Sequence, residues 1–133
     1  MSKRSIVLVE SDSRLADLYK SAIEAANSNV KVTVAVDAQG ALHSINEQTS
    51  LVILEIDLPD HNGFEFLYEF ASYDDWKHIP ILVLSRLRQT YFDPMMVSWE
   101  ELGVVDYLYK AETNLQELQT AVKQHSSKIA IES

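Results

Sequence analysis

The 133-residue chain contains no cysteine, only three glycines and three prolines, and only 11 lysine and arginine residues against 20 aspartates and glutamates. Without cysteine there are no disulfide bonds and no thiolate metal sites, which is typical of a cytoplasmic protein. Three glycines do not suffice for a glycine-rich phosphate-binding loop. The net charge of −9 argues against direct contact with nucleic acid or with an anionic membrane surface.

Long hydrophobic runs are also absent. No uninterrupted run approaches the roughly 18 residues that a membrane-spanning helix requires. The N-terminal stretch Met1-Ser2-Lys3-Arg4 lacks the apolar segment and the cleavage site of a signal peptide. The length suits one domain that buries a core without disulfides or metal. We expect a single cytoplasmic domain over residues 1–133, with a core at about residues 5–125 and a tail at 126–133 that has no clear pattern.

Two hydrophobic periodicities alternate five times along the chain. Apolar or β-branched runs predict strands at residues 6–9, 30–36, 51–56, 79–84 and 107–109. Apolar residues at helical spacing follow four of them, namely Leu15, Leu18, Ala22 and Ala26; Ala38, Ala41, Leu42 and Ile45; Phe64, Leu67, Phe70 and Ala71; and Leu115, Leu118 and Val122. The alternation predicts an α/β fold with a five-stranded parallel sheet and helices on both faces.

Aspartates mark the starts of the second and fourth expected helices. Asp37 is a candidate N-cap for the second helix. Asp93 followed by Pro94 has the pattern of an N-cap and first helical turn, and it predicts a fourth helix that ends near Gly103.

The most informative stretch is the apolar run that begins at Leu51 and ends in Glu55 and Asp57, just before Pro59. It predicts a buried strand that delivers carboxylates to its C-terminal end, where open α/β sheets place their sites. The stretch resembles the third strand of bacterial response-regulator receiver domains, in which the phosphoacceptor aspartate lies four residues before a proline. Glu55 holds that position here, and Gly63 matches the glycine of the same motif.

The end of the first strand extends the resemblance. Receiver domains place two acids there that help to hold Mg²⁺. Glu10 takes the first acidic place, Ser11 replaces the second, and Asp12 is an acid one position too late that is better explained as a helix N-cap. Because Mg²⁺ prefers several oxygen ligands including carboxylates, we expect no cofactor, or at most a weakened Mg²⁺ site at Glu10 and Glu55. Glu10 is expected to lie partly solvated at the pocket mouth.

The switch residues of receiver domains have counterparts here, and the resemblance spans about residues 5–125. It implies a flavodoxin-like arrangement in which Ser85 matches the hydroxyl residue that meets the phosphoryl group. Lys110 matches the lysine beside the phosphoacceptor, and Tyr107 matches the mobile aromatic. Ala111 replaces the proline that usually follows the lysine, so we expect a trans peptide bond there.

Several readings of the site remain open from the sequence. We expect Glu55 to lie within about 4 Å of Lys110, as in an ion pair, which would hold the domain either in an active-like state or as a fixed scaffold. Residual response to Mg²⁺ or phosphorylation is an alternative, with Asp57 at the pocket rim as a second acceptor. Arg86 either covers the site or points to solvent. Glu10 and Glu55-x-Asp57 also resemble the acids of metal-dependent toprim enzymes of nucleic acids, an alternative that the charge disfavours.

The resemblance implies a signalling domain, not an enzyme, that binds a histidine kinase, an output domain or another signalling protein. In receiver domains the face of the fourth helix, fifth strand and fifth helix mediates dimer or partner contacts. Candidates on this face are Met95, Met96, Trp99 and Tyr109, and we expect Trp99 and one methionine to belong to the core. The sequence therefore predicts a homodimer or partner contact that needs no phosphorylation.

Overall fold

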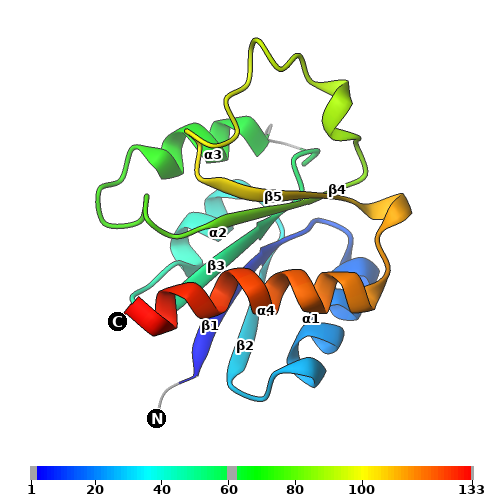
Figure 1. Cartoon of the computed structure of the whole chain (residues 1–133), viewed down its shortest axis with the longest axis vertical. Helices are drawn as coiled ribbons and strands as arrows, with labels where there is room; N and C mark the ends of the chain where they lie inside the picture. The colour runs from blue at the N-terminus through cyan, green and yellow to red at the C-terminus, as the bar shows by residue number, and fades with distance from the viewer. Residues whose placement is uncertain (1–2, 60–62, 133) are drawn as a thin grey trace.

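The computed structural model describes residues 3–59 and 63–132, with side chains as far as Ser126. Five parallel strands form one sheet in the order β2-β1-β3-β4-β5 (Figure 1). The strands are β1 (Arg4–Val9), β2 (Val30–Ala35), β3 (Thr49–Leu54), β4 (Ile81–Ser85) and β5 (Val104–Tyr109). Every residue of β3 and β4 is buried, as the continuous apolar runs predict for central strands of a covered sheet. The predicted flavodoxin-like α/β fold is confirmed.

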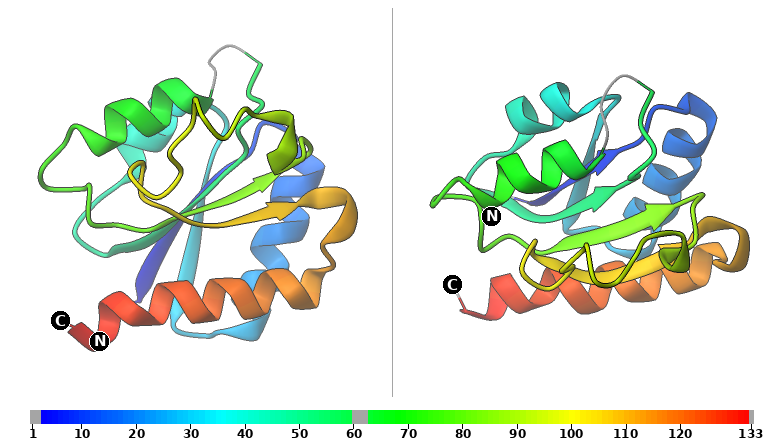
Figure 2. Two further views of the ribbon diagram at one scale, coloured as in Figure 1. Left: turned by 45° about the horizontal axis from the view of Figure 1, so that its top comes forward. Right: turned by 90° about the horizontal axis from the view of Figure 1, so that it is seen from above.

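Four α-helices cover the two faces of the sheet, as Figure 2 shows from two further directions. Their bounds are α1 (Ser13–Ala26), α2 (Ala38–Ser44), α3 (Gly63–Ala71) and α4 (Leu115–Glu132), and the short 3-10 helices are η1 (Gln89–Tyr91) and η2 (Lys110–Glu112). One hydrophobic cluster joins the sheet to α1 and α4, and the other joins it to α2 and α3. Asp37 caps α2 as predicted, because its side chain accepts a hydrogen bond from the Gly40 N–H.

The fourth predicted helix is wrong. Residues 86–103, which we call the β4–β5 crossover, contain η1 and a series of turns in its place. Asp93 begins only a single turn, in which its side chain accepts the Met95 N–H and its carbonyl accepts the Met96 N–H. Phe92, Val97 and Trp99 all pack against the core. At about 100° per residue, a helix would turn Val97 away from the face that carries Phe92 and Trp99. The irregular path instead lets Val97 pack against the core together with these two rings.

Two hydrophobic stripes also differ from the prediction. Helix α1 buries Ala16, Tyr19 and Ile23, whereas Leu18 is 47% exposed. The observed face buries more apolar area, because a tyrosine and an isoleucine stand where the predicted stripe offered Ala22 and Ala26.

Helix α4 continues well past the expected end of the core. It buries Leu118, Ala121 and Val122, and Leu115 is partly exposed. The predicted patternless tail is helical as far as Glu132, and Ser133 lies outside the described residues. In the described part of the chain, none of the helices combines the length and the hydrophobicity needed to cross a membrane.

Glycine is required at the start of α3 and at the end of the β4–β5 crossover. Gly63 begins α3, donates its N–H to the Ile56 carbonyl at 2.8 Å, and leaves so little space that an added Cβ would lie 2.6 Å from the Ile56 backbone. Gly103 ends the β4–β5 crossover with a φ of 82°, a conformation that side-chain-bearing residues rarely adopt.

Candidate functional site

The carboxyl ends of neighbouring parallel strands bring the predicted site residues together. Glu10 follows Val9 at the end of β1, and Glu55 follows Leu54 at the end of β3, where Val9 and Leu54 are register partners. Ser85 ends β4 beside Tyr109, the last residue of β5, and Lys110 follows immediately. Because the strands run parallel, their four ends meet at one edge of the sheet, where a doubly wound fold places its site.

Lys110 joins the two glutamates in a compact buried group, which we call the Lys110 cluster (Glu10, Glu55 and Lys110). The Lys110 Nζ lies 2.6 Å from Glu10 Oε1 and 2.8 Å from Glu55 Oε1. The lysine side chain is 12% exposed, and those of the two glutamates are 4% and 3% exposed. The predicted contact between Glu55 and Lys110 is confirmed. The prediction of a partly solvated Glu10 is wrong, because the lysine draws this carboxylate into the same buried group.

All four carboxylate oxygens of the cluster accept hydrogen bonds. Glu10 Oε2 accepts the Asp12 N–H at 3.1 Å. Glu55 Oε2 accepts the Asp57 N–H at 3.1 Å, and Glu55 Oε1 accepts the Arg86 N–H at 3.0 Å in addition to the lysine. Two buried negative charges are thus offset by one ammonium and three main-chain donors, which is the condition for burying charges without a large penalty.

The electrostatics of the cluster favour the charged form of Lys110. Burial acts to lower its pKa, but the hydrogen bonds and negative charges of Glu10 and Glu55 outweigh burial and raise the pKa above the ordinary lysine value. Tyr19 of α1 lies close enough to sense the same charges. Burial is the main cause that raises the pKa of Tyr19. The charge of Lys110 acts to lower this pKa, and the charges of Glu10 and Glu55 act to raise it.

The two other switch residues are both bonded to Leu87 of the β4–β5 crossover. Ser85 is fully buried, and its hydroxyl accepts the Leu87 N–H at 3.1 Å. The Tyr107 hydroxyl donates to the Leu87 carbonyl at 2.6 Å. Burial raises the pKa of Tyr107, and a hydrogen bond with Ser85 partly offsets this. Among the described residues, the hydrogen-bond donors to the Glu55 carboxylate are Lys110, Arg86 and Asp57, and Ser85 is not one of them.

Two arginines of the crossover hold the rim of the site. Arg86 forms an ion pair with Asp57, so its side chain, although 69% exposed, lies along the rim of the site. Arg88 stacks on the Tyr109 ring at 4.4 Å and pairs with Glu112 at 3.0 Å. Asp57 lies at the rim, as expected. No local pattern in the sequence indicates the contacts of Arg88, because stacking partners depend on how the crossover is folded.

The remaining residues of the first-strand motif lie outside the buried group. Asp12 caps α1 as predicted, since its side chain accepts the N–H groups of Arg14 and Leu15 at 2.9 and 3.1 Å. Ser11 is exposed. Among the side chains that the structure describes, no three of His, Asp or Glu are grouped so that they could hold a metal ion. The Lys110–Ala111 peptide bond is trans, as expected.

The interface candidates are divided between core and surface. Trp99 belongs to a chain of ring contacts that runs from Phe64 through Phe92 to Tyr107, with centroid separations of 5.0 to 5.5 Å. Met95 and Met96 are 90% and 75% exposed. The expectation that one methionine belongs to the core is therefore wrong. Both lie in the single turn after Asp93, whereas Phe92 and Trp99 on either side provide the anchors.

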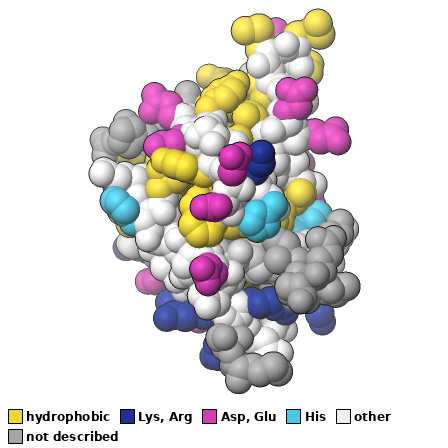
Figure 3. All heavy atoms as spheres, turned by 90° about the vertical axis from the view of Figure 1, so that its left-hand side faces the viewer, with side chains coloured by type: hydrophobic (Ala, Val, Ile, Leu, Met, Phe, Trp, Pro, Cys, Tyr) yellow, Lys and Arg dark blue, Asp and Glu magenta, His cyan; other side chains and the backbone are white. Residues whose placement is uncertain are grey.

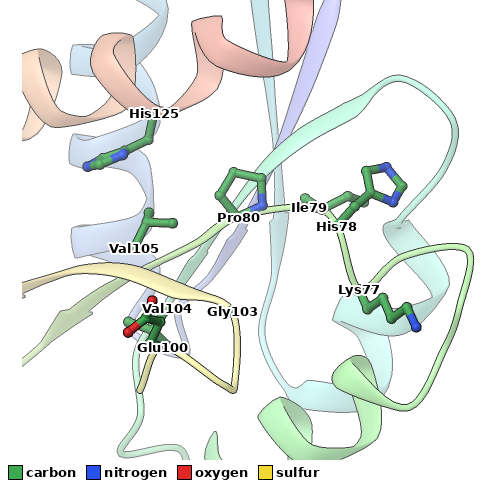
Figure 4. Close-up of a pocket in the computed structure, with 9 residues that line it drawn as sticks. All are labelled: Lys77, His78, Ile79, Pro80, Glu100, Gly103, Val104, Val105 and His125. Atoms are coloured by element: carbon green, nitrogen blue, oxygen red, sulfur yellow. The ribbon is translucent and has the colours of Figure 1, made fainter. Parts of the chain in front are cut away.

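A cavity of about 570 Å³ lies at the opposite end of the sheet (Figure 4). It is lined by the segment before β4, the start of β5 and His125 of α4. In Figure 4 the side chains of Lys77 and His78 lie on the far side of Ile79 from His125. His125 itself faces Asp106 at 3.4 Å.

Comparison with known proteins agrees with this geometry. The chain belongs to the response regulator receiver domain family, whose model matches residues 6–123. It is 32% identical to the transcriptional regulatory protein GltR of Pseudomonas aeruginosa over 80% of this chain and 43% of the relative. It is 27% identical to the KDP operon transcriptional regulatory protein KdpE of Escherichia coli over 95% of this chain and 54% of the relative.

Among solved structures, the chain is similar to a CheY-like response regulator receiver domain protein of Methanospirillum hungatei, with a TM-score of 0.82 and 22% identity over 99% of this chain and 100% of the other. The chain spans about half the length of the curated relatives, 43% and 54%. It is thus a receiver domain of two-component signalling, and the toprim-like alternative has no support.

Proposed function

We propose that this receiver domain acts through protein–protein contacts that do not depend on phosphorylation, with Glu55 in the place of the phosphoacceptor. The observation that carries the proposal is the Lys110 cluster. Lys110 is bonded at 2.6 and 2.8 Å to two buried carboxylates whose oxygens all accept hydrogen bonds. A phosphoryl group arriving here would have to displace these bonds, and leaving the freed groups unpaired would be costly.

The same contacts argue against Mg²⁺ in the pocket. An octahedral ion needs free oxygen ligands and usually retains several waters. Both carboxylates already accept hydrogen bonds, an ammonium group lies between them, and exposed Ser11 stands where a second acid would be needed. The residues do not fit the ion that the family implies, so no step of the proposal passes through a metal.

The switch residues support a fixed arrangement. Leu87 is held at its N–H by Ser85 and at its carbonyl by Tyr107, and the neighbouring Arg86 N–H is bonded to Glu55. In this arrangement the Ser85 hydroxyl is engaged with the crossover and not with Glu55. We therefore favour a fixed scaffold over an imitation of the phosphorylated state.

The test is incubation with acetyl phosphate and Mg²⁺, followed by mass spectrometry of the intact chain. We expect no added phosphoryl group. The variant Ser11→Asp/Glu55→Asp restores both acids and should become phosphorylated, whereas Glu55→Asp alone should recover little. A phosphoryl mass gain on the parent chain would overturn the proposal, and mapping it to Asp57 would favour the alternative acceptor.

The second part of the proposal concerns where a partner binds. The face predicted from the fourth helix, fifth strand and fifth helix lacks the fourth of the expected helices, so the contact would be made by the β4–β5 crossover, where Met95 and Met96 are exposed. A second copy of the chain and a different signalling protein are the two candidate occupants. The variant Met96→Glu/Tyr109→Glu should lose the contact, as measured by mass in light scattering and by pull-down. Unchanged mass and unchanged partners would exclude this face.

A further inference from the structure

Strand β2 lies at one edge of the sheet, so one side of its backbone faces away from every other strand. On the inner side, the Asn29 carbonyl accepts the Arg4 N–H at 3.0 Å, and the Ala35 carbonyl accepts the Glu10 N–H at 2.9 Å. Because backbone groups alternate in direction along a strand, three residues point their N–H and C=O groups to the open edge. These residues are Val30, Val32 and Val34. An open edge of this kind is a template on which another strand can pair.

The chain itself occupies two of the three outward N–H groups. The Val30 N–H is bonded to the Asn27 carbonyl at 3.2 Å, within the turn that precedes β2. The Val32 N–H donates to Glu24 Oε2 of α1 at 2.8 Å. Val32 is fully buried, and a buried N–H requires a partner. The carboxylate therefore takes the donor at the centre of the edge, which is the donor that an added strand would use.

The position of Glu24 in its helix is explained by this contact and not by the helix. Glu24 lies in the last turn of α1, where the helix dipole favours cations over acids. None of the residues of this turn is basic. The bond from the Val32 N–H to a charged acceptor is, by contrast, among the stronger kinds of hydrogen bond.

A second copy of the chain is the strand that fits this edge. Two β2 strands related by a two-fold axis at Val32 would bond Val32 to its counterpart and place Lys31 opposite Thr33 of the second copy. This arrangement brings no acids together within the strand pair, because Lys31 is the only charged residue of β2. Figure 3 keeps the vertical direction of Figure 1. It shows Lys and Arg side chains at the lower end of the molecule, where β2 begins, and most Asp and Glu side chains above them.

We propose that Glu24 closes the β2 edge of the sheet and so prevents two copies of the chain from pairing strand to strand. Lys31 is exposed and adds a second barrier, since edge strands use lysine to oppose pairing. The proposal goes beyond the proposed function, because β2 and β5 are opposite edges of the sheet. It explains how a domain that acts through protein contacts avoids an unwanted contact with itself.

The test compares variants that share Lys31→Thr, which removes the lysine of the edge. Light scattering over a range of concentrations measures the mass, at physiological salt that screens the net charge of −9. We expect Glu24→Ala/Lys31→Thr to double in mass as its concentration rises. A mass that stays monomeric over the whole range would overturn the inference. Urea midpoints establish that each variant folds.

Two controls have the same net charge as this variant. Asp17→Ala/Lys31→Thr removes an exposed acid of the same helix. Glu24→Gln/Lys31→Thr keeps a side-chain oxygen that can accept the Val32 N–H. Both should stay monomeric. A dimer of the Asp17 control would assign the association to lost negative charge. A dimer of the glutamine variant would show that the hydrogen bond does not close the edge. Either result would overturn the inference.

A proline locates the contact. Val34→Pro removes one of the outward N–H groups, and edge strands accept proline where the N–H faces away from the sheet. Adding it to Glu24→Ala/Lys31→Thr should therefore restore the monomeric mass. A dimer that persists with the proline would lie elsewhere on the molecule and would overturn the inference.

Amide hydrogen exchange tests the same bond in the parent chain, without any substitution. The Val34 N–H also points outward, and it has no side-chain acceptor among the described residues. We expect the Val32 N–H to exchange at least about tenfold more slowly than that of Val34, because its bond to a carboxylate must first open. Equal exchange at the two positions would overturn the inference.

The crossover contact of the proposed function is distinguished by its own variant. Adding Met96→Glu/Tyr109→Glu to Glu24→Ala/Lys31→Thr should leave the β2 dimer intact. Loss of the dimer would place the association on the crossover and overturn the inference. A phosphoryl mass gain on the parent chain would overturn the proposed function and leave the result at β2 as measured.

Discussion

The Lys110 cluster and the β4–β5 crossover lie next to each other in the fold but are built in opposite ways. The cluster buries three charged side chains and satisfies every carboxylate oxygen. The crossover has no α-helix, yet Phe92 and Trp99 reach the core while its methionines face solvent. The buried charges fix the geometry of the switch region. In the crossover, the packing of aromatic rings holds the backbone in place without a regular secondary structure.

The two regions are joined at Leu87. Its N–H and carbonyl are bonded to Ser85 and Tyr107, and Tyr107 in turn contacts Trp99 at 5.3 Å. A change in the cluster that released Arg86 or Ser85 would therefore alter the crossover through Leu87 and the Tyr107 ring. The comparison can be tested by disrupting each region separately.

The largest effect is expected for Lys110→Met. This substitution leaves two buried carboxylates without their ammonium partner, which costs about 3–5 kcal/mol of unfolding free energy. Urea denaturation measures the loss. Lys31→Met, at an exposed position of β2, should stay within about 0.5 kcal/mol of the parent. The triple variant Glu10→Gln/Glu55→Gln/Lys110→Met should regain much of the stability. A loss of less than about 1 kcal/mol for Lys110→Met would mean that the cluster is not tightly coupled.

Trp99→Ala should be next in size and should act on the crossover. Removing a fully buried aromatic side chain costs about 3–5 kcal/mol, and Trp99 is only partly buried, so we expect about 2 kcal/mol. Limited proteolysis should then cut within residues 89–100 sooner than in the parent. Met96→Ala, in the same segment but 75% exposed, is the matched control and should leave stability and cleavage unchanged. Equal sensitivity of the two variants would contradict the anchoring role of the tryptophan.

A smaller effect is expected on the decline of the unfolding free energy at alkaline pH, to which Lys110 contributes. The pKa of Lys110 is raised in the folded chain. Its stabilising effect is therefore complete below the unfolded lysine pKa of about 10.4 and is lost as the pH rises through the higher folded value. Tyr19 and Tyr107, whose pKa values are also raised, act in the same direction. We expect Glu10→Gln/Glu55→Gln to show a smaller decline above pH 10 than the parent in urea denaturation. Parallel curves would show that the tyrosines alone cause the decline.

The smallest effect is expected for Arg86→Ala. Its side chain is 69% exposed, and surface ion pairs such as that with Asp57 contribute less than about 1 kcal/mol. The main-chain bond from Arg86 to Glu55 persists in this variant, so the cluster should keep its geometry. The measurement is again urea denaturation. If Arg86→Ala lost as much unfolding free energy as Lys110→Met, the ion pair at the rim, and not the buried cluster, would be the main stabilising contact of this region.

The sequence determined the strands and the edge of the sheet at which the site lies. Continuous apolar runs such as Leu51–Leu54 are buried on both faces, and their period and order are local properties that can be read along the chain. The sequence also paired Glu55 with Lys110, because residues that end parallel strands of one sheet meet at the same edge. The caps at Asp12 and Asp37 are equally local and were predicted correctly.

Tertiary structure decided whatever depended on competition between partners distant in the sequence. Glu10 is buried because Lys110, 100 residues away, bonds to it, and no local pattern contains that choice. The Asp93-Pro94 signal predicted a helix, but Phe92, Val97 and Trp99 could all reach the core only along an irregular path. Leu18 is exposed, and Tyr19 and Ile23 are buried in its stead, because α1 packs its larger apolar face against the sheet. Local propensities are worth fractions of a kcal/mol per residue, and the burial of a single large side chain is worth about 1.5–3 kcal/mol, so packing prevails where the two conflict.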